Sequence, residues 1–104
     1  MYEYFEIDLE NAVFEWDENK DALNFSKHGI HFKTAIKAFM DPDKLIREDK
    51  EHGHETRYNV LGKAYKIMFI VCSFEENNVI RLISARIASE PEKERYKHGE
   101  YEIS

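Results

Sequence analysis

Cysteine, proline and glycine are scarce in this chain of 104 residues, which contains one, two and four of them respectively. A single cysteine excludes an internal disulfide bond, and the position of Cys72 in the apolar run 67–72 indicates a small buried side chain. Apolar runs of this length are too short to span a bilayer, and no signal-peptide pattern opens the sequence. We therefore expect a cytoplasmic protein with no membrane partner.

Basic residues are absent from the first 18 positions, which hold seven acidic residues. The whole chain has 15 Lys and Arg against 21 Asp and Glu, a net charge of −6. Residues 19–104 therefore hold 15 basic residues and 14 acidic ones, so this larger part of the chain is nearly neutral. Net charge therefore does not exclude a nucleic-acid partner. We expect one domain over residues 14–104, preceded by an acidic N-terminal extension over residues 1–13.

The first expected helix runs from about residue 18 to residue 28. Asp17 suits the N-cap, and Gly29 suits the left-handed position that ends a helix. Ala22 and Phe25 are expected to face inward, because the helix needs an apolar side.

Further elements follow along the chain. Apolar residues repeat at helical spacing over residues 32–40 and predict a second, core-facing helix that ends at Met40. Ser89 and Glu92 fit a capping box for a third, mostly charged helix over residues 90–98. Strands are expected at residues 14–16, 45–48, 56–61, 66–74 and 79–87. We predict an α+β fold: an antiparallel sheet of about four strands with two N-terminal helices and one C-terminal helix against one face, the strand at residues 14–16 being short.

The expected strand at residues 79–87 carries two arginines. Apolar residues occupy both of its alternating positions, which favours the middle of the sheet. Arg81 interrupts one apolar face, and Arg86 lies on the opposite face if the strand is regular. A guanidinium in such a strand needs a carboxylate partner or an opening into a cleft. An internal ion pair, to an acidic helix or to Asp17, and a contact with a ligand both remain open.

Three motifs stand at fixed spacings: FEWDENK at residues 14–20, KHGI at residues 27–30 and ISAR at residues 83–86, accompanied by Asn24 and Phe32. Over about residues 14–101 this combination resembles the BrnT family, the ribonuclease toxins of bacterial type II toxin–antitoxin pairs. The resemblance implies a RelE-like fold, RNA cleavage that inhibits translation, and neutralisation by a cognate BrnA-like antitoxin whose DNA-binding domain represses their shared operon. The chain departs from the family pattern in its first dozen residues. It also departs at His31, where a capping Ser, Thr or Asp is expected.

A ribonuclease that works without a metal needs fixed cations and groups that titrate. The 2′-hydroxyl loses a proton as it attacks phosphorus, negative charge builds on the phosphoryl oxygens, and the leaving 5′-oxygen gains a proton. Guanidinium groups offer paired donors to phosphate, and imidazole changes charge near neutral pH. The candidates are Arg81, Arg86 and Arg57 for the phosphate, His28 and Glu48 for proton transfer, and Lys20 and Lys27 for RNA binding.

Each candidate also has a purely structural interpretation. Lys27 and His28 suit the C-terminal end of a helix dipole, and Glu48 can pair with an arginine. Lys20 can be an exposed residue of a first helical turn, and we interpret Trp16 as a core residue rather than a platform for a base.

Two other functions remain open. The chain can be a catalytically weak toxin-like module that acts mainly in an antitoxin complex. Alternatively, His52 and His54 can serve a metal-dependent nuclease, although two imidazoles on a flexible loop do not make a closed metal site. We expect no metal and no cofactor. The expected partners are RNA and the antitoxin in a hetero-oligomer, with operator DNA bound only through the antitoxin.

Overall fold

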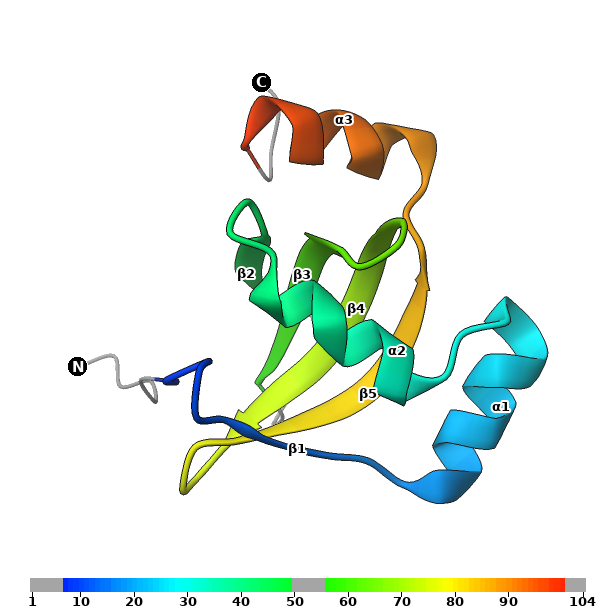
Figure 1. The fold of residues 1–104 in the computed structure, drawn as a ribbon, viewed down its shortest axis with the longest axis vertical. Helices are drawn as coiled ribbons and strands as arrows, with labels where there is room; N and C mark the ends of the chain where they lie inside the picture. The colour runs from blue at the N-terminus through cyan, green and yellow to red at the C-terminus, as the bar shows by residue number, and fades with distance from the viewer. Residues whose placement is uncertain (1–6, 50–55, 101–104) are drawn as a thin grey trace.

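A five-stranded sheet with the strand order β1-β5-β4-β3-β2 forms the middle of the structure (Figure 1). The structure is a computed structural model that describes residues 7–49 and 56–100. Along the chain its elements are β1 (Val13–Glu15), α1 (Glu18–His28), α2 (Phe32–Ala35), the 3-10 helix η1 (Ile36–Met40), β2 (Leu45–Asp49), β3 (Arg57–Lys63), β4 (Ile67–Glu75), β5 (Val79–Ile87) and α3 (Glu90–His98). The expected α+β class is confirmed.

The sheet is mixed, however, and not an antiparallel sheet of about four strands. Strands β2 to β5 are antiparallel neighbours, whereas β1 adds a fifth strand parallel to β5, with Val13 beside Val79 and Glu15 beside Arg81. Parallel strands are not joined by a hairpin, so the sequence around the three-residue strand β1 does not indicate that it pairs with β5.

The helices also differ from the prediction, because they do not all pack on one face. In Figure 1, α2 and η1 lie across one face of the sheet, α1 stands beside the β5 edge, and α3 crosses one end of the strands. Within the described ranges no helix crosses the middle of the other face.

Helix α1 begins and ends where the sequence predicts, but a different side of it is buried. Asp17 accepts a hydrogen bond from the backbone of Asn19 at 2.7 Å, and Gly29 adopts the left-handed conformation with a φ of 70°. Ala22 is exposed and Phe25 is 47% exposed, so the expectation that they face inward is wrong.

Asn24 is the buried residue of α1, and it replaces a strand neighbour at the edge of the sheet. Its side-chain nitrogen donates to the carbonyl of Ala85 at 2.8 Å and to the carbonyl of Ile30 at 2.9 Å, and its side-chain oxygen accepts from the N–H of Ala85 at 3.0 Å. β1 pairs only with the first part of β5, so Asn24 satisfies backbone groups of β5 that no strand covers.

The second predicted helix is divided into α2 and η1. A 3-10 helix has three residues per turn, so the stripe of apolar residues drifts off the core, and Met40 is 55% exposed instead of buried. η1 lies close to β3: a side-chain carbon at Gly62 would stand 2.6 Å from the carbonyl oxygen of Ala38. The N-terminus of α2 is capped by Asp21, which accepts from the N–H of Phe32 at 2.7 Å, because His31 provides no side-chain cap.

A β-bulge in β5 changes which residues share a face. Ser84 pairs with Val71 and Leu82 pairs with Cys72, so Ile83 is an extra residue in β5. Before the bulge Leu82 lies on the covered face, and after it Ala85 does, both being buried. Because Arg81 and Arg86 are five positions apart with one extra residue between them, they lie on the same face. The prediction of opposite faces, which assumed a regular strand, is wrong.

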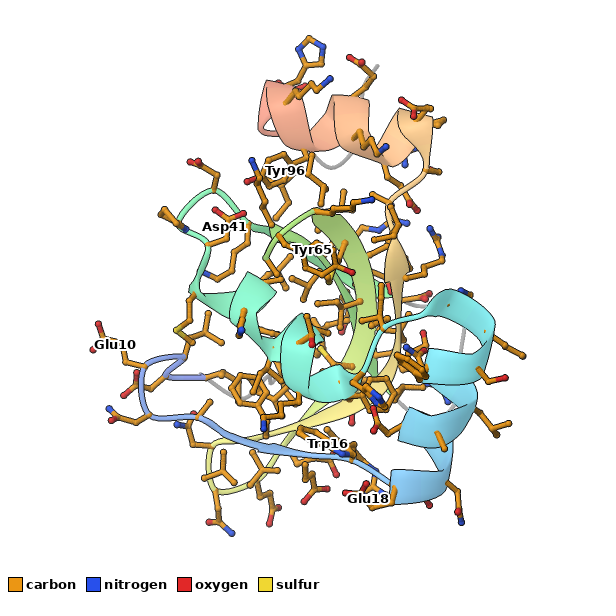
Figure 2. All side chains as sticks on the ribbon, turned by 45° about the vertical axis from the view of Figure 1, so that its right-hand side comes forward. Glu10, Trp16, Glu18, Asp41, Tyr65 and Tyr96 are labelled. Atoms are coloured by element: carbon orange, nitrogen blue, oxygen red, sulfur yellow. The ribbon has the colours of Figure 1, made fainter. Side chains whose placement is uncertain are left out.

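Residues outside the strands complete the core. Trp16, labelled in Figure 2, packs edge-on against Phe32 with 6.1 Å between ring centroids, which confirms its interpretation as a core residue. Ile7, Leu9 and Ala12 also pack against the core, and the division at residue 13 stays a prediction. Among the described residues no helix is long and apolar enough to cross a membrane.

Polar contacts hold α3 against the rest of the chain. The hydroxyl of Tyr96 donates to Asp41, which follows η1, at 2.5 Å, and the two side chains point toward one another in Figure 2. The expected capping box is present, with Ser89 accepting from the N–H of Glu92 and Glu92 accepting from the N–H of Ser89.

Candidate functional site

The face of the sheet that turns away from α2 and η1 carries four arginines. Side chains alternate between the faces of a strand, and Val60, Ile70 and Ala85, which pair across three strands, are fully buried on the covered face. By this register the opposite face holds Arg47, Arg57, Arg81 and Arg86, the set that we call the arginine face.

Arg86 is held by a carboxylate and by an aromatic ring. Its two terminal nitrogens donate to the two carboxylate oxygens of Glu92 at 2.8 and 2.9 Å, and its guanidinium carbon lies 4.3 Å from the centroid of the Phe69 ring. Burial alone raises the pKa of the Glu92 carboxyl, but hydrogen bonds from Arg86 and Ser89 outweigh it and bring the pKa below its ordinary value. The Glu92 carboxyl is therefore ionised near neutral pH.

Arg81 is paired with an acidic residue of the neighbouring strand. Its guanidinium donates to Glu15 of β1 at 2.5 Å, and both side chains are partly exposed. The internal ion pairs considered from the sequence are therefore present. Arg86 pairs with the acidic third helix as envisaged, but the partner of Arg81 is Glu15, because Asp17 caps α1 instead.

The middle of the arginine face contains two buried polar atoms that have no hydrogen-bond partner among the described residues. Arg47 lies beside Asn59 on the adjacent strand, and Arg57 and Ser73 are the residues next to the paired Tyr58 and Cys72. The hydroxyl of Ser73 and the side-chain oxygen of Asn59 are buried, and neither has a hydrogen-bond partner within the described ranges. Such atoms are rare in folded proteins and are satisfied when a ligand or water supplies the missing hydrogen bond.

Two lysines of α1 flank this face. Asp21 contacts His31 and Phe25 stacks on its ring, so this side of α1 faces α2. Lys20 and Lys27 are exposed, are seven residues apart and lie on the other side of Asn24, which points at the sheet edge. They therefore lie on the flank of α1 that borders the arginine face.

His28 and Glu48 lie elsewhere. His28 is an exposed residue of the last turn of α1, on the side of the helix that carries Asp21. Glu48 pairs in register with Tyr58, a neighbour of Cys72 on the covered face, so it is on the opposite face of the sheet from the arginines. The structure thus brings together the three predicted arginines and the two lysines, and it does not place His28 or Glu48 with them.

His52 and His54 lie outside the described residues. Among the described residues, no group of three or more His, Cys, Asp or Glu side chains could hold a metal ion.

A family model described as the ribonuclease toxin BrnT of type II toxin–antitoxin systems matches residues 16–92. The chain belongs to the BrnT family. Its structure is similar to the 1.1 Å crystal structure of the Brucella abortus ribonuclease toxin BrnT, with a TM-score of 0.63 and 23% sequence identity, over 77% of this chain and 100% of that chain. That likeness supports the fold, while the family model supports the function. No curated protein sequence matches the chain.

Membership of the BrnT family implies ribonuclease activity, an RNA substrate and an antitoxin partner. The matched range begins at Trp16 and ends at Glu92, so it contains every arginine of the arginine face and both lysines.

Three residues at the site were not identified from the sequence as parts of it. Glu15 and Glu92 are the carboxylate partners of the arginines, and Arg47 is a fourth cation on the face. The only sign of the second role of Glu92 is its position six residues after Arg86, where a helix that starts soon after the strand can bring it back. The pairing of Glu15 depends on the β1–β5 register, which no local pattern reveals.

Proposed function

We propose that this BrnT-family chain is an endoribonuclease that cleaves RNA on the arginine face without a metal ion or a cofactor and thereby inhibits translation. The observation that carries the proposal is the bulge at Ile83, which puts Arg81 and Arg86 on one face together with Arg57. Guanidinium groups in one plane can hold adjacent phosphates of an RNA strand and stabilise the charge that develops on the phosphoryl oxygens.

The other predicted site residues have separate roles in this proposal. Lys20 and Lys27 bind the RNA backbone beside the arginines. His28 and Glu48 stay predictions for proton transfer, and their positions away from the arginine face make them the least supported members of the set. Each is tested by its own substitution.

We further propose that the antitoxin is BrnA-like and forms a hetero-oligomer with this chain in the cytoplasm. In this proposal operator DNA is bound only by the antitoxin, residues 1–13 form an acidic extension of the domain at residues 14–104, and the fold is related to that of RelE. The positive charges of the arginine face suit a partner with an acidic segment.

A short RNA tests the proposal directly. Protein made by cell-free synthesis should cleave the RNA in EDTA, and the product of the adjacent open reading frame should stop the reaction. Arg86→Ala, Arg81→Ala and His28→Ala should each reduce cleavage, and Glu48→Gln tests the last candidate.

The matched control is Lys33→Ala, because Lys33 is an exposed cation of α2 on the other side of the molecule. If folded Arg86→Ala and Arg81→Ala variants cleave like the unaltered protein, the site lies elsewhere. If EDTA abolishes cleavage, the metal-independent mechanism is wrong.

The second candidate function is a catalytically weak module of an antitoxin complex that represses its own operon. The observation in its favour is that both strand arginines are already paired with carboxylates. Normal growth of cells that express the chain without its antitoxin, combined with repression of the operon when both proteins are present, supports this candidate over the first.

A further inference from the structure

Glu92 uses more of its carboxylate than a helix cap requires. One oxygen accepts from the N–H of Ser89 at 2.8 Å and from Arg86 at 2.8 Å, and the other accepts from Arg86 alone at 2.9 Å. A capping box needs only the first of these bonds. Glu92 is also only 8% exposed, so it is a charged side chain placed where charge is costly unless it is paired.

The contacts of Arg86 leave one edge of its guanidinium free. Of the five N–H groups that an arginine carries, two on Nη1 donate to Glu92 and to the carbonyl of Ile87, and one on Nη2 donates to Glu92. The Nε–H and the second N–H of Nη2 therefore remain, and no described residue accepts from them. In the planar guanidinium these two groups point in the same direction, which is the arrangement that matches two oxygens of one phosphate.

The side chain that carries this edge is also partly exposed and is fixed in orientation. The Arg86 side chain is 38% exposed, and its guanidinium lies over the Phe69 ring on the arginine face. A long arginine side chain normally has many rotamers, and holding it in one of them lowers the entropy that is lost when it binds an oxyanion.

We propose that Glu92 is the positioning residue of Arg86, which it holds so that the Nε and Nη2 edge meets a phosphate of the RNA. This inference rests on the proposed function. It gives Glu92 two roles: capping α3 and holding Arg86 in one orientation. The opposite possibility is that Glu92 only neutralises Arg86 and hinders RNA binding.

Glu92→Gln separates these possibilities. Glutamine can still accept from the N–H of Ser89, and it keeps the size of the side chain, but it cannot accept two hydrogen bonds from Arg86. On a short RNA we expect kcat to fall about tenfold or more, with KM unchanged or lower, because the guanidinium loses its fixed orientation while the site gains net positive charge. A rise in cleavage overturns the proposal and shows that Glu92 masks Arg86.

Two matched controls lie at the start of the same helix. Glu90→Gln removes the same charge from an exposed residue that contacts Lys93 and not Arg86, and Ser89→Ala removes the cap hydroxyl without changing the pair. Both should keep the kcat of the unaltered protein, although Ser89→Ala should unfold at a lower temperature. If Ser89→Ala lowers kcat as much as Glu92→Gln does, Glu92 acts as a cap only. If Glu92→Gln does not fold, Glu92→Asp, which is one methylene shorter, replaces it.

A double substitution tests whether Glu92 acts through Arg86. In an Arg86→Lys background, Glu92→Gln should cause no further loss of kcat, because the group that it positions is gone. If the kcat of the double variant falls by the product of the two single losses, the two residues act independently and the proposal is wrong. If Arg86→Lys alone cleaves like the unaltered protein, the proposed site is wrong. If Arg86→Lys is impaired and Glu92→Gln is not, only the positioning role is wrong.

Discussion

Ser73 illustrates at the scale of one residue how the arginine face differs from a core designed for stability alone. Its hydroxyl is buried on β4 and has no hydrogen-bond partner in the part of the chain that the structure describes. Burying a hydroxyl without a partner destabilises the folded state, whereas burying an apolar group of the same size does not.

We therefore expect Ser73→Ala to raise the free energy of unfolding by about 1 kcal/mol, because it removes the unsatisfied hydroxyl. Ser89→Ala is the matched control, since the Ser89 hydroxyl accepts the N–H of Glu92, and it should lower the free energy of unfolding by about 1 kcal/mol. Urea unfolding measures both. A destabilised Ser73→Ala variant implies that the hydroxyl has a partner.

Tyr96 is a second residue whose contact has a measurable consequence. Burial and the hydrogen bond to Asp41 raise the pKa of Tyr96 to about 12 from its ordinary value of 10.0. Because the folded state favours the protonated phenol, this contribution to stability is complete below about pH 10 and is lost as the pH rises through about 12.

We expect Tyr96→Phe to lower the free energy of unfolding by about 1.5 kcal/mol near neutral pH, because a hydrogen bond to a charged group is lost. In an ultraviolet titration of the tyrosines, the variant should lack the step near pH 12 that the unaltered protein shows. Tyr65→Phe is the control, because Tyr65 is exposed and its removal should leave that step in place. A step that persists in Tyr96→Phe belongs to another group.

At the scale of an element, β5 shows what local sequence cannot determine. The apolar residues on both alternating positions indicated a strand buried on two faces. In the structure the bulge at Ile83 accounts for this pattern, because it moves Ala85 onto the face of Leu82. A bulge is defined against the partner strand, so its position depends on the register of β4.

Deletion of Ile83 should therefore leave the protein folded, with Arg81 and Arg86 still on one face. In the shortened strand Ser84 follows Leu82 directly and stays opposite Val71, so Ala85 and Arg86 keep the faces that they have in the structure. Ile83→Ala is the control: it keeps the bulge and removes only most of the side chain, so its free energy of unfolding should fall by about 2 kcal/mol or less. Circular dichroism and urea unfolding measure both. A deletion variant that does not fold, beside a folded Ile83→Ala variant, contradicts the account of the bulge.

For the helices too, some features are determined by nearby residues and others by contacts distant in the sequence. Asp17, Gly29 and the Ser89–Glu92 box were predictable because a helix end is determined by the residues beside it. The buried side of α1 was not, because Asn24 is polar and its partners are backbone groups of Ala85, 61 positions away. The same limit applies to the site: its arginines could be chosen from the sequence, but their common face and their carboxylate partners follow from register.

At the scale of the whole molecule, the distribution of charge matters more than its sum. The chain has a net charge of −6, yet four arginines share one sheet face and two lysines border it. The proposed binding of RNA at this face would release cations from the phosphates, so we expect affinity to fall as salt rises despite the acidic total.

The slope of the salt dependence also gives the number of contacts between the protein and the RNA phosphates. For single strands the slope of log affinity against log salt is about 0.7 per phosphate contact, so Arg81→Ala and Lys27→Ala should each reduce the slope by about that amount. Binding is measured with an RNA that has 2′-deoxyribose at the cleavage position, because the proposed reaction needs the 2′-hydroxyl and this strand is not cut. Arg81→Ala also releases Glu15, so Lys27→Ala, an exposed residue with no partner to disturb among the described residues, gives the cleaner value.

Lys33→Ala and Lys37→Ala are the controls, because these exposed cations lie on α2 and η1, which cover the other face of the sheet. They change the net charge as much as Lys27→Ala does, so a general field effect would alter all three slopes equally. A changed slope for Lys27→Ala alone places the strand beside the arginine face. Equal changes in all three variants contradict a local RNA site, since only the total charge then governs binding.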